Sequence, residues 1–134
     1  MKNKAILAAA VLVVVFLVSF LPQYLKANRL EQELLQSRND AAGGELRDLI
    51  GLAYLQANQK NFGLAAETTS RFFSQARNAA GQATDAERRK AIENLLSSRD
   101  RVTAELAKAD PAAVNDLQAL FLLTRRATGL PGDK

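Results

Sequence analysis

The stretch AILAAAVLVVVFLVSFL, residues 5–21, decides the architecture of this 134-residue chain. It carries no charged side chain, and charge stays absent through Leu25. A helix over residues 5–25, at about 1.5 Å per residue, spans roughly 31 Å, which is close to the thickness of the hydrocarbon layer of a bilayer. A buried core helix is disfavoured because the stretch has no polar face and a 134-residue protein has little interior in which to bury such a helix on all sides. We therefore predict a transmembrane helix over residues 5–25, in contact with the lipid bilayer.

The residues that flank this segment indicate an anchor that is not removed. A cleaved signal peptide ends on small residues at positions −3 and −1, and both candidate sites have a leucine, Leu17 or Leu25, at −3. Lysines and aromatic side chains are typical of the membrane–water boundary. We assign four residues to that interface: Lys2, Lys4, Tyr24 and Lys26.

Orientation follows less directly, because the basic residues on the two flanks nearly balance. Lys2 and Lys4 precede the segment, in a basic tail of residues 1–4, and Lys26, Arg29 and Arg38 follow it. A very short basic tail before an apolar run looks like a bacterial export signal. We expect a single-pass protein of the bacterial inner membrane, with a cytoplasmic N-terminus and a periplasmic or extracytoplasmic domain.

Composition excludes most catalytic chemistry. The chain has no Cys and no His, which removes disulfides, thiol nucleophiles, the usual zinc ligands and the general base of hydrolytic triads. The sequence has no glycine-rich phosphate-binding loop. We expect the acidic residues that lie close together in the sequence to be on solvent-exposed helix surface. We expect a non-enzymatic protein that holds no metal and no cofactor.

The net charge of +4 does not indicate nucleic-acid binding. Lys2, Lys4 and Lys26 flank the membrane segment, and without them 15 of the 18 basic residues face 14 acidic ones, a net charge of +1. The basic cluster Arg88–Lys90 has no aromatic residues interleaved with it, as stacking on bases would require. We expect no nucleic-acid partner.

The rest of the chain predicts helices only, beginning with a stalk over residues 26–42. The stalk is polar, with a thin apolar stripe of Leu30, Leu34 and Leu35, and Ala41–Gly44 should break it. It is either exposed or paired with a second copy, so a homo-oligomer stays an open alternative.

Four further helical segments are predicted over residues 43–128. Helices should cover residues 45–58 and 62–80, and the first has a full apolar face of Leu46, Leu49, Ile50, Ala53, Tyr54 and Ala57. One long helix is expected over residues 84–109, with Thr84 and Glu87 as a capping box. Its coiled-coil-like seam contains Arg99, which either extends to solvent at the rim or pairs with a carboxylate. A last helix should cover residues 111–128, followed by a short tail at 129–134.

The segment from Leu49 to Phe73 resembles a tetratricopeptide repeat. Ile50–Gly51 and Tyr54 match the family's apolar residue, glycine and tyrosine, and Asn61–Phe62, Ala65–Ala66 and Glu67 resemble the turn and second helix. The resemblance implies two antiparallel helices in close approach. We therefore predict an all-α fold with one N-terminal transmembrane helix and a small bundle of two antiparallel helical hairpins, either tetratricopeptide-like or a generic four-helix bundle.

These features favour a membrane-anchored protein-binding or scaffold module, because tetratricopeptide-like proteins generally bind peptides or organise assemblies. One alternative is a small accessory subunit of a larger membrane protein complex, and another is a helical extracytoplasmic sensor domain. The candidate partner-binding residues are those left over once the core is assigned: Leu52, Leu55, Asn58 and Phe73.

Overall fold

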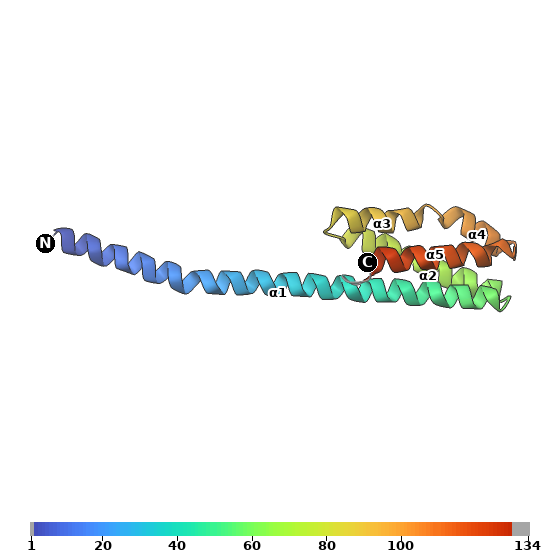
Figure 1. The fold of residues 1–134 in the computed structure, drawn as a ribbon, viewed down its shortest axis with the longest axis horizontal. Helices are drawn as coiled ribbons and strands as arrows, with labels where there is room; N and C mark the ends of the chain where they lie inside the picture. Colours follow the sequence, from blue (N-terminus) through green and yellow to red (C-terminus); the bar gives the residue numbers. More distant parts are fainter. Residues whose placement is uncertain (1, 130–134) are drawn as a thin grey trace. The chain divides into compact units, whose positions relative to one another are not determined.

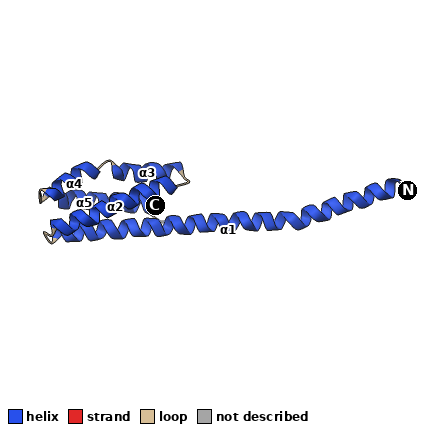
Figure 2. Cartoon of the chain, turned by 180° about the vertical axis from the view of Figure 1, so that it is seen from behind, coloured by secondary structure: helices blue, strands red, loops and turns tan. Residues whose placement is uncertain are grey.

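The computed structural model describes residues 2–129, apart from the side chains of residues 20 and 21. In this range the chain forms helices α1 (Lys2–Asn58), α2 (Phe62–Gln82), α3 (Ala86–Leu96), α4 (Arg99–Ala107) and α5 (Ala112–Thr128). The described part contains no strand, which confirms the predicted all-α class (Figure 2). Contacts divide the chain into unit 1, Met1–Ser37, and unit 2, Arg38–Lys134. Residues 130–134 of the predicted tail lie outside the described residues.

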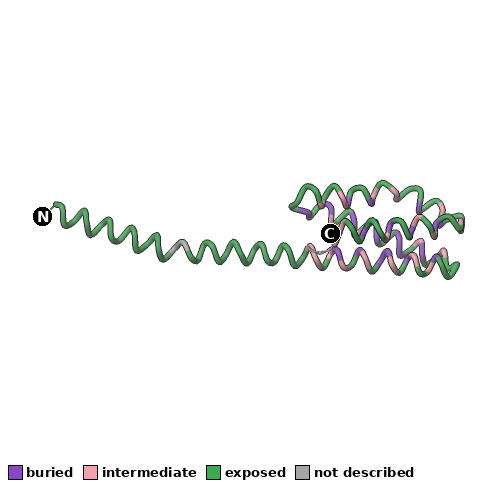
Figure 3. Tube along the Cα trace, in the orientation of Figure 1, coloured by how far each residue is buried: buried purple, intermediate pink, exposed green. Residues whose placement is uncertain are grey.

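Unit 1 is the N-terminal part of α1, and every described side chain in it is exposed (Figure 3). This helix is long and apolar enough to cross a membrane, a criterion that an N-terminal signal sequence also meets. The helix continues through Pro22 and through residues 26–37, so the prediction that the stalk extends the apolar helix is confirmed.

Unit 2 encloses an apolar core to which all five helices contribute. On α1 the predicted face is confirmed, because Leu46, Leu49, Ile50, Ala53 and Ala57 are buried and Tyr54 is partly buried. Helices α2 and α5 both pack against α3 and α4 (Figure 1). The predicted seam is confirmed at Ile92, Leu95, Val102 and Leu106, all of which are buried.

The expected helix break at Ala41–Gly44 is wrong, because α1 runs through these residues without interruption. The glycine at position 43 serves close packing instead. A Cβ added at Gly43 would lie 3.0 Å from the Thr128 Cβ and 3.3 Å from an Arg88 guanidinium nitrogen. Arg88 donates a 2.6 Å hydrogen bond to the Asn39 carbonyl, and Arg47 donates to the Thr128 carbonyl and hydroxyl at 2.6 and 3.1 Å. These two arginines tie the start of α3 and the end of α5 to α1.

The expected single helix over residues 84–109 is also wrong, because it is divided into α3 and α4 at Ser97–Ser98. The Ser97 hydroxyl donates to the Asn94 carbonyl at 2.6 Å, and the Ser98 hydroxyl donates to the Leu95 carbonyl at 2.8 Å. Serine hydroxyls that bond nearby carbonyls compete with the helical ladder. The N-cap of α3 is Asp85 instead of Thr84, since the Asp85 carboxylate accepts from the backbone N–H groups of Glu87 and Arg88.

Gly51 has a different neighbour from the one that the repeat resemblance implies. We expected the glycine to let α1 approach α2, its partner in the hairpin. Instead, a Cβ added at Gly51 would lie 3.4 Å from the Phe121 ring of α5. On its other flank α1 contacts α2, where Gln75 donates a 2.9 Å hydrogen bond to Glu45. In unit 2, α1 therefore lies between α2 and α5.

Candidate functional site

The structure separates the four candidate partner-binding residues into two places. Leu52, Leu55 and Asn58 lie on the outward side of α1, with Leu52 45% and Leu55 50% exposed. Phe73 lies on α2 and is only 3% exposed, so its assignment as a residue left over from the core is wrong. Its ring packs edge-on against Phe72, with 5.2 Å between the ring centroids.

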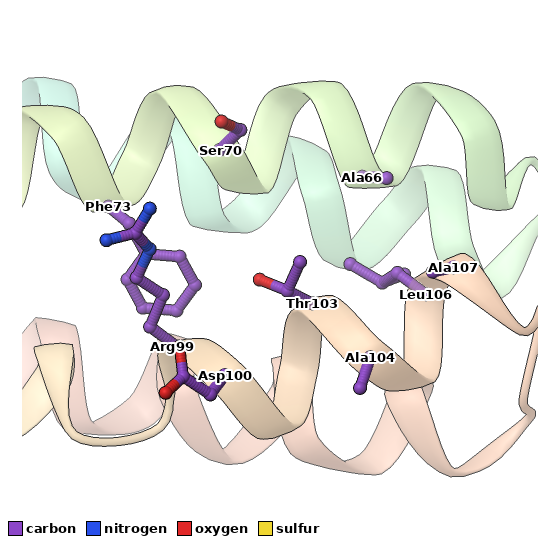
Figure 4. A pocket seen from close by; sticks show the side chains of 9 residues that line it. All are labelled: Ala66, Ser70, Phe73, Arg99, Asp100, Thr103, Ala104, Leu106 and Ala107. Atoms are coloured by element: carbon purple, nitrogen blue, oxygen red, sulfur yellow. The ribbon is translucent and has the colours of Figure 1, made fainter.

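Phe73 nevertheless contributes to the wall of a groove between α2 and α4 (Figure 4). The groove has a volume of about 340 Å³. Helix α2 supplies three of its lining residues and α4 supplies the rest: Ala66, Ser70, Phe73, Arg99, Asp100, Thr103, Ala104, Leu106 and Ala107. Most of the lining side chains are small, which leaves space between the two helices, whereas the large Phe73 and Leu106 side chains are buried.

One end of this groove carries the charges. Arg99 extends from α4 toward α2 beside the Phe73 ring, and the Asp100 carboxylate stays close to α4 (Figure 4). Arg99 is exposed and has no ion pair among residues 2–129, where the ion pair that forms is Arg101–Asp116 at 2.7 Å. This agrees with an arginine at the rim and not with one that pairs across the seam.

The break between α3 and α4 sets the position of Arg99. Ser98 is the N-cap residue of α4, and Arg99 and Asp100 are the first residues of that helix. Sequence reasoning treated Arg99 as a member of one continuous seam and so missed the groove. The available signal was the Ser97–Ser98 pair, whose hydroxyls end α3 by bonding its last carbonyls.

A carboxyl pair lies on the other side of α4, where it faces α5. Burial raises the pKa of the Glu105 carboxyl, and the negative charge of the Asp116 carboxylate raises it further. The nearby Arg101 partly opposes these effects, and the charge of Asp110 adds to them. The Oε2 atom of Glu105 is buried without a hydrogen-bond partner. Burial and the charge of Asp116 therefore disfavour the ionised form of Glu105 in the folded protein.

The groove offers recognition chemistry. Its apolar wall suits an aliphatic or aromatic side chain, and the Arg99 guanidinium is a planar donor that suits a carboxylate. Within residues 2–129 no cluster of acidic side chains is placed to hold a metal ion. The four expected interface residues, Lys2, Lys4, Tyr24 and Lys26, lie exposed in unit 1.

No family model, no curated protein and no solved structure matches this chain.

Proposed function

We propose that this protein is a single-pass, membrane-anchored, non-enzymatic module that binds another protein. The observation that supports the proposal best is the groove between α2 and α4, in which an apolar wall lies beside the Arg99 guanidinium, which pairs with no carboxylate of residues 2–129. A peptide segment that carries one apolar side chain and one carboxylate would complement both features. The resemblance of Leu49–Phe73 to a tetratricopeptide repeat, with its two antiparallel helices, supports the same class of function.

In this proposal residues 5–25 fix the module in the bacterial inner membrane. The short basic tail before the apolar run favours a cytoplasmic N-terminus and a periplasmic unit 2. Lys2 and Lys4 on one side, and Tyr24 and Lys26 on the other, then lie at the two membrane boundaries.

The test is co-purification of the full-length protein in mild detergent, followed by identification of the chains that stay bound. We expect a discrete partner that is lost from Thr103→Trp, which fills the groove, and from Arg99→Glu, which reverses the charge at its rim. Arg71→Glu is the matched control, because Arg71 is an exposed arginine of α2 that does not line the groove. If both groove variants bind the partner as well as the unaltered protein does, the groove is not the partner-binding site.

The alternative, an accessory subunit of a larger membrane complex, is favoured by the apolar side chains of residues 5–25, which are exposed wherever they are described and could pack against other membrane helices. An exchange of residues 5–25 for an unrelated transmembrane helix separates the two functions. An adaptor keeps its partner after the exchange, whereas an accessory subunit held mainly by its membrane helix loses it.

A further inference from the structure

The segment of α1 over residues 26–41 has a periodic apolar stripe of exposed side chains, of which Ala41, at its end, lines a hollow together with residues of α2. In heptad notation Ala27, Leu34 and Ala41 occupy the a positions, and Leu30 and Ser37 occupy the d positions. Leu30 is 60% exposed and Leu34 is 56% exposed. The spacing alternates strictly between three and four residues, which is the seam of a left-handed coiled coil.

The stripe ends where α1 begins to pack inside unit 2. The next d and a positions after Ala41 are Gly44 and Asp48, which are not core residues of a coiled coil. From Gly43 onward a different face of the helix is buried, beginning with Gly43 and Leu46. The stripe therefore lies in unit 1 except for Ala41, and it is not an extension of the core face of unit 2.

The charges beside the stripe indicate which occupant fits it. Lys26 and Glu33 occupy the g positions, and Glu31 and Arg38 occupy the following e positions. In a parallel pair of this segment, each g residue faces the e residue five positions later on the other copy. Lys26 would then face Glu31, and Glu33 would face Arg38. Both contacts join opposite charges, and none of the four residues has an ion pair within the described part of the chain.

We propose that residues 26–41 pair with the same segment of a second copy as a parallel two-stranded coiled coil. The parallel direction rests on the proposed anchor, because two copies inserted the same way into one membrane present their stalks side by side. The seam is short, because Leu30 and Leu34 are its only large apolar residues. Confinement of both copies to one membrane raises their effective concentration and so favours the pairing. The proposed seam contains no residue that lines the groove between α2 and α4.

A charge exchange in the full-length protein tests the proposal directly. Glu33→Lys places a lysine against Arg38 of the other copy, and Arg38→Glu places a glutamate against Glu33 of the other copy. Each single variant should therefore form fewer homodimers in bilayer nanodiscs or vesicles. When the two variants are produced together, both contacts in a heterodimer become attractive. Heterodimers should then make up more than half of all dimers, which is the fraction that random pairing gives. Random pairing of the two variants would overturn the proposal.

Cross-linking provides an independent readout, because the chain contains no Cys. Ser37→Cys introduces a thiol in the seam, and Gln32→Cys introduces one at an f position on the opposite side of the helix. With a short bis-maleimide on intact membranes, we expect dimers from Ser37→Cys and several-fold fewer from Gln32→Cys. Equal yields from the two positions, or no dimer from Ser37→Cys, would contradict the parallel seam.

Two adjacent leucines provide the matched control for the apolar contact. Leu34 lies in the seam, whereas Leu35 lies at a b position outside it. Leu34→Ser should reduce cross-linking through Ser37→Cys, and Leu35→Ser should leave it unchanged. The reverse order would show that another face of the helix pairs. These readouts do not depend on the partner of the groove, so the dimer and the proposed adaptor function can fail separately.

Discussion

Helix α1 contains two apolar regions, and only one of them is buried. Residues 5–25 are apolar on all sides, and every side chain described there is exposed. Between residues 43 and 57 the apolar side chains alternate between a buried face, with Ile50 and Ala53, and an outward side, with Leu52 and Leu55. The comparison shows that hydrophobic content alone does not indicate where a helix lies. An apolar surface without any charged residue suits lipid, whereas an apolar face beside charged residues such as Arg47 and Asp48 suits packing against other helices.

A charge on the buried face of the second region should have the largest effect. Ile50 is fully buried, so Ile50→Asp places a carboxylate in the core without a partner, at a cost of several kcal/mol against a total stability of about 5–15 kcal/mol. We expect unit 2 to lose its cooperative thermal transition in circular dichroism of the detergent-solubilised protein. Leu52→Asp, two residues later and exposed, should change the transition little. Similar melting of the two variants would show that the buried face is assigned wrongly.

A charge in the first region should act on membrane insertion and not on unit 2. Val14→Arg places a charge near the middle of the apolar segment, where a translocon-based scale assigns about 2.5–3.5 kcal/mol to arginine. We expect a smaller fraction of the chain in the membrane pellet after alkaline extraction, with Val14→Leu as the control. Complete retention of Val14→Arg in the pellet would contradict the assignment of residues 5–25 as the anchor.

The two adjacent glycines at the start of the second region should respond in opposite directions. A Cβ at Gly43 meets Thr128 at 3.0 Å, whereas at Gly44 the nearest atom is the flexible end of Arg47 at 3.9 Å. Gly43→Leu should lower the free energy of unfolding by about 1–3 kcal/mol through overpacking. Gly44→Ala should raise it by up to about 1 kcal/mol, because alanine favours the helix. Chemical denaturation measures both. Stabilisation by Gly43→Leu would show that α5 does not approach α1 closely at this point.

The smallest effect concerns the pH dependence of unit 2. The pKa of Glu105 is raised from its ordinary value of 4.5, so its protonated form favours folding. This contribution is fully present below the ordinary pKa and is lost as the pH rises through the raised pKa. Glu105→Gln should therefore raise the melting temperature slightly at pH 7 and reduce the gain seen on acidification. Glu93→Gln, an exposed glutamate of α3, should do neither. If the two substitutions change the melting temperature equally, burial of Glu105 is not the cause of the pH dependence.

Local rules predicted most of the helical pattern and failed where packing overrides them. The apolar period of Leu46, Ile50 and Ala53 located the buried face of α1, because a period of 3.6 residues places those side chains on one side of the helix. The same local rules predict a helix break at the glycine pair, positions 43 and 44. In the structure the helix is continuous at Gly43, where Arg88 and Thr128 pack against it. Both residues are far from Gly43 in the sequence, so local rules do not include their effect.

The candidate site was predicted only in part. Leu52 and Leu55 were assigned to the outward side of α1, and they are exposed, because a helix with one buried face leaves the opposite residues outside. Phe73 was not distinguishable from an outward residue, since its burial depends on how α2 packs against α3 and α4. The groove itself needs residues from α2 and α4 together, which no local pattern brings into contact.

The sequence alone determined the helical class, the apolar N-terminal segment and the face of α1 that enters the core, because charge, composition and periodicity act over a few residues at a time. The tertiary structure decided three other features: the continuity of α1 through Gly43, the division between α3 and α4 at Ser97–Ser98, and the position of Arg99 beside Phe73. These features depend on which distant side chains meet, and that is fixed only when the helices pack around their common core.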